Sequence, residues 1–205
     1  MTTRLYATMQ EQITEQFRQQ ILSGAFEPGE RLREEHIARH FGVSRGPIRD
    51  TFVRLSREGL LEAIPNVGVR VAHPPSVFKR QCLLRIRRQI ECDALRRAAR
   101  TAEPDAAQRL LAALQANLAE YRRACRRGVL ADVVRLDMAF HREIVAAADA
   151  GSLLTVWFPV ISQLHLRYSR HTSLIESYEE HNAIVTALAQ HGPARAAPLL
   201  RAHIV

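Results

Sequence analysis

The chain has 205 residues, 47% of them hydrophobic, and a formal net charge of +8, so it is long enough to bury one large core or two smaller ones. This composition excludes an intrinsically disordered chain. Three cysteines, Cys82, Cys92 and Cys125, form neither a CxxC pair nor an even disulfide set, which fits buried thiols in a reducing compartment. The sequence has no signal peptide and no apolar run long enough to cross a bilayer, so we expect a soluble, cytoplasmic protein that does not associate with membranes.

The positive charge is unevenly distributed. Residues 1–73 hold ten arginines against nine carboxylates, a surplus of one, whereas residues 31–57 alone hold seven arginines against three carboxylates, a surplus of four. Affinity for phosphates depends on the local density of positive charge. The shorter segment is therefore the better candidate for contact with nucleic acid.

Residues 5–23 form the first predicted helix, because Ile13, Phe17 and Ile21 repeat at i, i+4 and i+8. Gly24 follows as its stop, and the Phe-Glu-Pro-Gly sequence at 26–29 predicts a turn. A helix and a turn thus lead into the arginine-rich stretch.

Residues 34–57 predict two short helices joined by a tight turn. One apolar stripe marks the first helix, formed by Ile37, Ala38 and Phe41. Gly42 ends this helix, because glycine adopts a positive φ at a helix C-terminus without strain. Ser44 is suited to cap the second helix, and Pro47 lies in its first turn, where a missing N–H breaks no bond.

Arg45 and Arg49 lie four residues apart on the second predicted helix and share one stripe. A helix-turn-helix unit presents the first residues of its second helix to base edges in the major groove. An arginine there can bind guanine O6 and N7 with two hydrogen bonds, for roughly 1–3 kcal/mol of discrimination against another base. Paired arginines also occur on solvated helix faces, so this pattern alone leaves DNA binding and a plain all-α fold equally open.

Residues 61–72 predict two short strands around a Pro-Asn-Val-Gly turn, because Val67, Val69 and Val71 alternate with polar or small residues. A two-stranded wing directly after a recognition helix is typical of a winged helix-turn-helix. Two prolines in the segment 73–76 exclude helix and strand there. We therefore expect a DNA-binding domain at residues 1–72, a linker at 73–76 and a second domain at 77–205.

From Val77 onward every segment has a helical period, so the fold class is mainly α. Helices are predicted at 76–101, 104–126, 130–148, 152–171, 174–190 and 193–205, with Gly, Pro or short polar breaks between them. Six helices with short connections predict an all-α bundle. The core candidates are Leu83, Ile86, Ile90, Leu95, Leu110, Leu111, Leu114, Leu118, Val133, Leu136, Phe140 and Ile144.

The placement of the histidines suggests a second kind of site. Asp137 and His141 are four apart and point from one face of a predicted helix, while His181 and His203 fall at helical spacing from aliphatic residues. One carboxylate and three imidazoles inside a bundle can bind a metal, although hydrogen-bonded core histidines would give the same pattern. We interpret the other histidines as surface or structural residues: His36, His40, His73, His165, His171 and His191.

Residues 21–71 carry an ordered set of positions: Gly24, Pro28-Gly29, Arg31-Leu32, Phe41-Gly42-Val43-Ser44-Arg45, Pro47, Arg49, Leu55, Glu58-Gly59-Leu60, Pro65 and Gly68. This set resembles the DNA-binding domain of the GntR family of bacterial transcription regulators. The resemblance implies base or phosphate contacts by Arg45 and Arg49, a phosphate contact by Ser44, and approach of Gly68 to the minor groove. The implied DNA-binding residues are Arg33, Ser44, Arg45, Gly46, Arg49, Asn66 and Gly68.

The chain departs from the family pattern at three positions. Glu35 stands where a basic phosphate contact is common, Gly46 replaces a threonine, and Asp50 replaces a glutamate. Because Glu35 and Gly46 offer no phosphate contact of the usual kind, we expect Arg45 and Arg49 to carry more of the binding.

The motifs Asp137-Met-Ala-Phe-His141 and Glu180-His181-x-x-Ile184, with His203 beyond them, are similar to the FCD domain of FadR-type GntR regulators, in its six-helix, VanR-like branch. The resemblance implies that Asp137, His141, His181 and His203 hold a divalent metal, zinc first and nickel, manganese or iron as alternatives, beside a pocket for small organic acids. The Arg-x-x-x-Glu pattern of the first bundle helix implies that Arg87 pairs with the effector carboxylate. The effector-binding residues are expected to be Arg87, Glu91 and Arg167.

These expectations combine into a ligand-responsive transcription regulator, with repression as the expected output and no catalytic residues. It would bind a palindromic DNA operator as a homodimer, because two recognition helices about one turn of DNA apart discriminate better than one. Residues 77–205 would bind a small carboxylic acid and form the dimer. Two alternatives remain: a metal-dependent enzyme whose site activates water, and an architectural DNA-binding protein without sequence preference.

Overall fold

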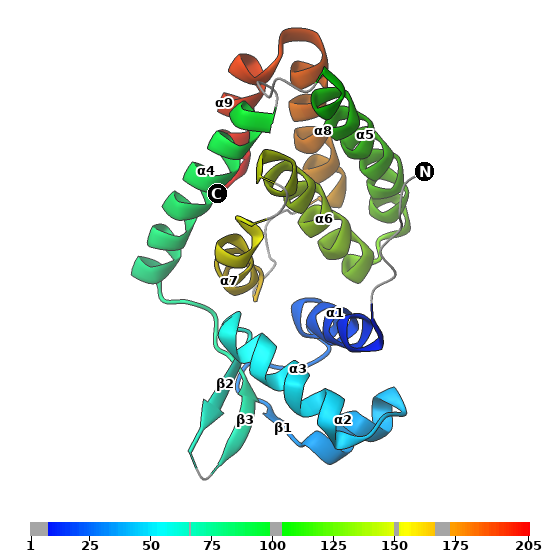
Figure 1. Cartoon of the computed structure of the whole chain (residues 1–205), viewed down its shortest axis with the longest axis vertical. Helices are drawn as coiled ribbons and strands as arrows, with labels where there is room; N and C mark the ends of the chain where they lie inside the picture. Colours follow the sequence, from blue (N-terminus) through cyan, green and yellow to red (C-terminus); the bar gives the residue numbers. More distant parts are fainter. Residues whose placement is uncertain (1–7, 66, 99–103, 150–151, 167–172) are drawn as a thin grey trace.

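The computed structural model describes residues 8–65, 67–98, 104–149, 152–166 and 173–205. Within these ranges the chain forms nine α-helices and one three-stranded antiparallel sheet, so the prediction of a mainly α fold is confirmed. Figure 1 shows α1–α3 and the sheet at one end of the molecule and a bundle of α4–α9 at the other. No helix in the described part of the chain is long and apolar enough to span a bilayer.

The helix-turn-helix is built on α1 (Met9–Leu22). Thr8 and Glu11 form a reciprocal capping box that satisfies two N–H groups at the start of α1. α2 (Glu34–Phe41) ends at Gly42, whose φ of +65° is the left-handed conformation that glycine tolerates. α3 (Arg45–Arg57) then packs on α1, with Phe17 from α1 stacked on Phe52 from α3.

The wing is larger than the sequence predicted. β2 (Leu61–Ile64) and β3 (Gly68–Val71) form the expected hairpin, but β1 (Arg31–Leu32) pairs with the other edge of β3, giving the order β1-β3-β2. The predicted two-stranded hairpin is therefore confirmed, and β1 adds a third strand that the sequence did not predict. A strand of two residues has no alternation to detect, and only its ladder with β3, far away in sequence, defines it.

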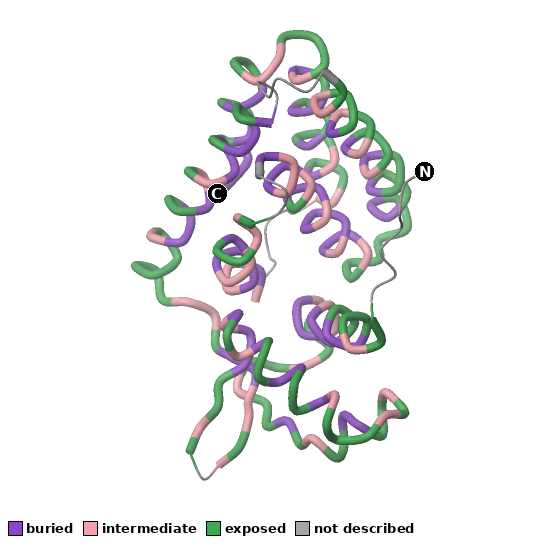
Figure 2. The backbone as a smooth tube through the Cα atoms, viewed as in Figure 1, coloured by how far each residue is buried: buried purple, intermediate pink, exposed green. Residues whose placement is uncertain are grey.

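The bundle contains the six expected helices: α4 (Val77–Ala98), α5 (Pro104–Arg127), α6 (Leu130–Asp149), α7 (Leu154–His165), α8 (Leu174–His191) and α9 (Pro193–His203). α7 is shorter than the predicted helix at 152–171. Residues 167–171 of that predicted helix lie outside the described ranges. Figure 2 shows the buried residues of α4 along the side that faces the other bundle helices.

The inward side of α4 matches the prediction only in part: Leu83 and Leu95 are buried as expected. Ile86 is 45% exposed, so its assignment to the core was wrong, and Ile90 is only half-buried. Arg87 and Glu91 are buried instead, at 2% and 0% exposure. Burying a charged pair costs free energy unless both groups are paired and hydrogen-bonded, so this face of α4 indicates a polar site within the bundle.

The DNA-binding end and the bundle share a continuous apolar core, which runs from Ile13 and Phe17 to Trp157 and Ile161. At its border the guanidinium of Arg18 lies over the ring of Phe158, 5.3 Å from the centroid. Gly59, with a φ of +75°, sits so close to Gln163 that an added Cβ would lie 2.8 Å from that side chain. The two parts are thus in direct contact through α7.

Candidate DNA-binding surface and metal centre

The predicted DNA-binding residues of α3 occupy one exposed end of that helix. Arg45 is its first residue and Arg49 follows one turn later, with side chains 63% and 68% exposed. Gly46 is exposed between them. Ser44 stands at the N-cap position, but its side chain makes no capping hydrogen bond, so the predicted capping interaction is absent. These four residues form one surface that can approach a DNA groove.

The remaining predicted residues lie at the start of α2, on the wing, or outside the described ranges. Arg33 is the exposed N-cap residue of α2, and Gly68 begins β3 with a φ of +108°. A glycine at this position allows a backbone conformation and a close approach that a side chain would hinder. Asn66 lies outside the described residues, so its predicted role stays a prediction.

Two further arginines on the wing were missed by the sequence analysis. Arg31 and Arg70 are directly paired across β1 and β3. Arg31 also lies beside Gly68, its Nε 3.9 Å from the position of an added Cβ. Like charges directly opposite each other destabilise a strand pair, and the buried Nε of Arg70 has no hydrogen-bond partner among the described residues. A phosphate bound at the wing would offset the repulsion between the two arginines.

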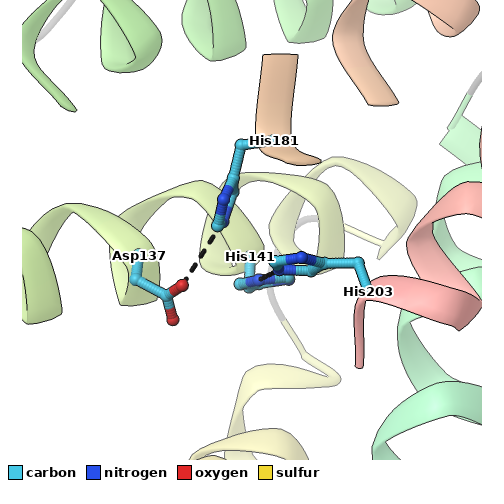
Figure 3. A group of neighbouring side chains, drawn as sticks. All are labelled: Asp137, His141, His181 and His203. Atoms are coloured by element: carbon cyan, nitrogen blue, oxygen red, sulfur yellow. Dashed lines mark hydrogen bonds and ion pairs between the residues drawn. The ribbon is translucent and has the colours of Figure 1, made fainter. Parts of the chain in front are cut away.

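The four predicted metal ligands come together in the centre of the bundle. α6 supplies Asp137 and His141, α8 supplies His181, and α9 supplies His203, with their side chains directed toward one another (Figure 3). Their ligand atoms all lie within 4.8 Å of one another, and all four residues are buried. Three nitrogen donors and one oxygen donor at such distances could hold a metal ion.

Hydrogen-bond acceptors fix the orientation of the three imidazoles. His181 Nδ1 lies 2.7 Å from the carbonyl oxygen of Ser177, and His203 Nδ1 lies 2.7 Å from Glu180 Oε2. His141 Nδ1 lies 2.7 Å from Glu91 Oε2, but the N–H does not point at this oxygen well enough for an aligned hydrogen bond. Since these oxygens only accept, we assign a proton to each Nδ1, which leaves a lone pair on each Nε2.

Without a cation, this arrangement would be unfavourable. The Nε2 atoms of His141 and His203 face each other at 3.2 Å, and a hydrogen bond between them would require one imidazole to carry both protons. Asp137 Oδ1 and His181 Nε2, 3.3 Å apart, are buried without an aligned hydrogen bond to any described residue. Buried polar atoms are nearly always paired, so these residues fit a divalent metal ion.

His165 supports the candidate ligand Asp137. It is 3% exposed, and its Nε2 lies 2.8 Å from Asp137 Oδ2 while its Nδ1 lies 3.0 Å from the carbonyl oxygen of Ile161. Burial would raise the pKa of Asp137, but its contacts with His165 and His181 outweigh burial and hold that pKa well below its usual value. Of the two roles expected for His165, surface or structural, its burial and contacts fit the structural one, and Asp137 is ionised at neutral pH.

Glu91 connects the candidate metal ligand His141 with two other buried side chains. Its Oε1 accepts hydrogen bonds from Arg87 Nε at 2.8 Å and from Trp157 Nε1 at 2.7 Å. Burial would raise the pKa of Glu91, but Arg87, His141 and Trp157 together lower it to about 2. Burial, aided by Arg87, lowers the pKa of His141 to about 4 against the opposing influence of Glu91. At neutral pH, Glu91 is thus charged and His141 is a neutral imidazole, the form that can bind a metal.

Two of the three predicted effector-binding residues, Arg87 and Glu91, lie in the described part of the chain. Arg87 is directed at Glu91, yet its Nη2 is buried without a hydrogen-bond partner among the described residues, so both N–H donors of Nη2 remain for ligand oxygens. Glu91 holds Arg87 in place. Arg167 lies outside the described residues. The predicted effector roles of these three residues remain predictions.

The structure combines two modules. A winged helix-turn-helix of the kind that binds DNA is followed by a helical bundle, whose buried histidine–aspartate cluster can hold a ligand. The family model of bacterial regulatory proteins, gntR family, matches residues 9–71, and that of the FCD domain matches residues 82–205. The chain therefore belongs to the GntR family and carries an FCD domain.

Comparisons with individual proteins agree with this assignment. The chain is 32% identical over 139 residues to the HTH-type transcriptional repressor RspR of Escherichia coli K12, an alignment that covers 68% of this chain and 59% of RspR. It is 30% identical over 197 residues to an HTH-type transcriptional regulator of Streptomyces ambofaciens, covering 91% and 78% of the two chains. The solved structure of E. coli McbR/YncC has the same fold, with a TM-score of 0.77, 21% identity, and coverage of 97% and 94%.

Proposed function

We propose that this protein is a transcription regulator that binds a palindromic DNA operator as a homodimer and whose affinity is set by a small carboxylic acid at a metal site. One observation carries this proposal. A single short helix, α7, contacts both the buried histidine–aspartate cluster and the DNA-binding end of the chain. Repression is the proposed output, supported by the similarity to RspR, which is a transcriptional repressor by name. Its place of action would be the bacterial cytoplasm, where the operator is.

The exposed end of α3 supports binding to specific DNA. Arg45 and Arg49 project from its first two turns, where a recognition helix meets base edges. Arg31 and Arg70 on the wing would add phosphate contacts. In this arrangement α3 would contact the bases, and the wing would position the protein on the DNA backbone.

Exposed apolar side chains on α4 support the homodimer. Val77 and Phe78 at its start are 76% and 77% exposed, and Ile86 about two turns later is 45% exposed. A second copy of the chain could cover these residues and remove their apolar surface from water. The same pairing would present two recognition helices to the two halves of a palindrome.

Asp137, His141, His181 and His203 would hold the metal, zinc first among zinc, nickel, manganese and iron. A metal held by these four residues would supply a positive charge that a ligand carboxylate could bind. Arg87 Nη2, buried and without a partner among the described residues, would donate a charge-assisted hydrogen bond to the same carboxylate. This donor set supports a small carboxylic acid as effector.

On one side, α7 contacts the residues around the metal candidates. Trp157 donates its indole N–H to Glu91, and His165 lies 2.8 Å from Asp137. An effector that contacts Glu91 or Arg87 would therefore alter the hydrogen bonds that hold α7.

On the other side, α7 contacts the DNA-binding end. Phe158 lies under Arg18 of α1, and Gln163 packs against Gly59 at the end of α3. A displacement of α7 would therefore shift α1 and the end of α3. A ligand changes DNA affinity only by its differential affinity for the two arrangements, typically about 1–3 kcal/mol.

The function is tested by selecting duplexes from a random-sequence pool with the purified protein and by measuring its metal content. We expect enrichment of a palindromic sequence and about one metal ion per chain. Arg49→Ala should lose the enrichment, whereas Arg126→Ala, an exposed arginine on α5, should retain it. Failure of the wild-type protein to enrich any sequence would refute the proposal.

A further inference from the structure

Two carboxylates in the first turn of α2 contact the two arginines of α3. Arg49 donates from Nε to Glu34 Oε1 and from Nη2 to Glu34 Oε2, both at 3.2 Å. Arg45 Nη2 lies 3.3 Å from Glu35 Oε2. The parallel, two-bond geometry of the Arg49 pair restricts its guanidinium more than a single contact would. The arginines assigned to base reading are thus held by neighbouring carboxylates.

These ion pairs contribute little to the stability of the fold. The side chains of Arg45 and Glu35 are 63% and 62% exposed, and Arg49 is 68% exposed. Water and salt screen ion pairs at such positions, and holding two long side chains together costs conformational entropy. A role in the interaction with DNA is a better physical reason for two adjacent pairs at this surface.

The Arg49 pair leaves the guanidinium able to read a base. A guanidinium has five N–H donors, and Glu34 accepts from the Nε side. The Nη1 donors and the second N–H of Nη2 remain on the opposite edge, which can bind guanine O6 and N7. Glu34 therefore fixes the direction of this edge before DNA arrives, and less conformational entropy is lost on binding.

The same carboxylates oppose binding to DNA in general. Affinity for DNA of any sequence comes mainly from neutralising phosphates with Arg and Lys. Glu34 and Glu35 neutralise Arg49 and Arg45 within the protein and place negative charge beside the approaching backbone. Their effect on a phosphate contact is therefore unfavourable, whereas a correctly placed base edge still finds its donors.

We propose that Glu34 and Glu35 are specificity-determining residues of the DNA site, because they position Arg49 and Arg45 toward base edges and weaken their attraction to phosphates. This inference rests on the proposed binding of a specific operator. It assigns to two acidic residues a role in selecting the correct sequence rather than in increasing affinity.

The test uses the duplex that the wild-type protein selects from a random pool and a shuffled duplex of the same composition. Glu34→Gln and Glu35→Gln should each bind the shuffled duplex more tightly and lower the selected-to-shuffled affinity ratio by about tenfold. In a plot of log affinity against log salt concentration, each Gln variant should have a steeper negative slope than the wild type, by about one unit for each arginine released. Glu120→Gln, the same change at an exposed position of α5, should match the wild type.

Glu34→Asp separates positioning from charge. It keeps the negative charge but shortens the side chain by one methylene, so it cannot maintain both bonds to Arg49 in the same place. We expect wild-type salt dependence with a lowered affinity ratio, and thermal midpoints near the wild type in all variants. A wild-type ratio in Glu34→Asp would overturn the positioning role, and wild-type ratios and slopes in both Gln variants would overturn the proposal. A wild-type protein that selects no duplex would instead refute the proposed function.

Discussion

Trp157 and Phe158 are neighbours in α7, yet they contact opposite parts of the protein. Trp157 donates a hydrogen bond of 2.7 Å to Glu91 beside the metal candidates, whereas the ring of Phe158 lies beneath Arg18 of α1. A helix of 12 residues thus carries both contacts. A helix this short, packed on both sides, moves largely as a unit, so it is well placed to pass a change in the bundle to the DNA-binding end.

Phe158→Ala tests this connection. Loss of the ring removes the cation–π contact with Arg18 but leaves the residues around Asp137 unchanged. We expect normal metal content, and a DNA affinity that responds to metal and effector several-fold less than in the wild type. Val156→Ala, at a position of α7 that is 55% exposed, provides the control. An unchanged response in Phe158→Ala would mean that the coupling takes another route, such as the linker at 73–76.

His165→Phe should weaken metal binding without removing a ligand. The substitution deletes the contact with Asp137 Oδ2 that orients the carboxylate. Loss of such an outer-shell partner typically lowers metal affinity about 10–100-fold. Competition with a chelator of known affinity measures the change, with His191→Phe at an exposed site as control. Equal affinity in the two variants would show that His165 does not support the metal site.

Acid should destabilise the metal-free protein in two stages. The pKa of His141 is lowered from 6.5 to about 4, so below pH 6.5 the unfolded chain binds a proton that the folded chain does not, and stability falls between about pH 6.5 and 4. The pKa of Glu91 is lowered from 4.5 to about 2, so its contribution is lost between about pH 4.5 and 2. At 1.36 kcal/mol per pK unit, each loss is roughly 3 kcal/mol.

Urea unfolding at several pH values in the presence of a chelator checks the first stage. His141→Gln should flatten the fall in stability between pH 6.5 and 4, whereas His191→Gln should retain it. If both variants keep the wild-type slope, His141 is not held neutral by its surroundings.

Arg31→Gln and Arg70→Gln should weaken DNA binding without changing sequence preference. If these wing residues bind phosphates, affinity for the selected and shuffled duplexes falls by the same factor, and the salt slope falls by about one for each residue. Arg126→Gln on α5 should have no effect. A change in the affinity ratio with an unchanged slope would indicate base contacts instead.

Local sequence signals were enough to predict the helix-turn-helix and the spacing of two metal candidates. Gly42 and the apolar repeat of α2 and α3 act within a few residues, and Asp137 and His141 share a helix face because they are four apart. Contacts that depend on tertiary packing could not be predicted. The pairing of Glu34 with Arg49 spans 15 positions, and it requires the angle between α2 and α3.

The inward face of α4 shows a different limit. The apolar repeat places Ile86 inside, but the structure exposes it and buries Arg87, for which only the family resemblance implied a place at a pocket. Arg87 is buried because it pairs with Glu91, which also accepts a hydrogen bond from Trp157. The sequence could not decide between a surface and a structural role for His165, since its partner Asp137 comes from another helix. Sequence patterns that assume an apolar interior fail at sites where polar groups satisfy one another.

The affinity of the wild-type protein for its selected duplex tests the central claim most directly. It is measured with metal removed or restored, and with or without the carboxylic acid that gives the largest thermal stabilisation of the metal-loaded protein. We predict that acid and metal together change the dissociation constant by about 5–150-fold relative to the metal-free protein. The same dissociation constant in all four conditions would contradict a regulator controlled through this site.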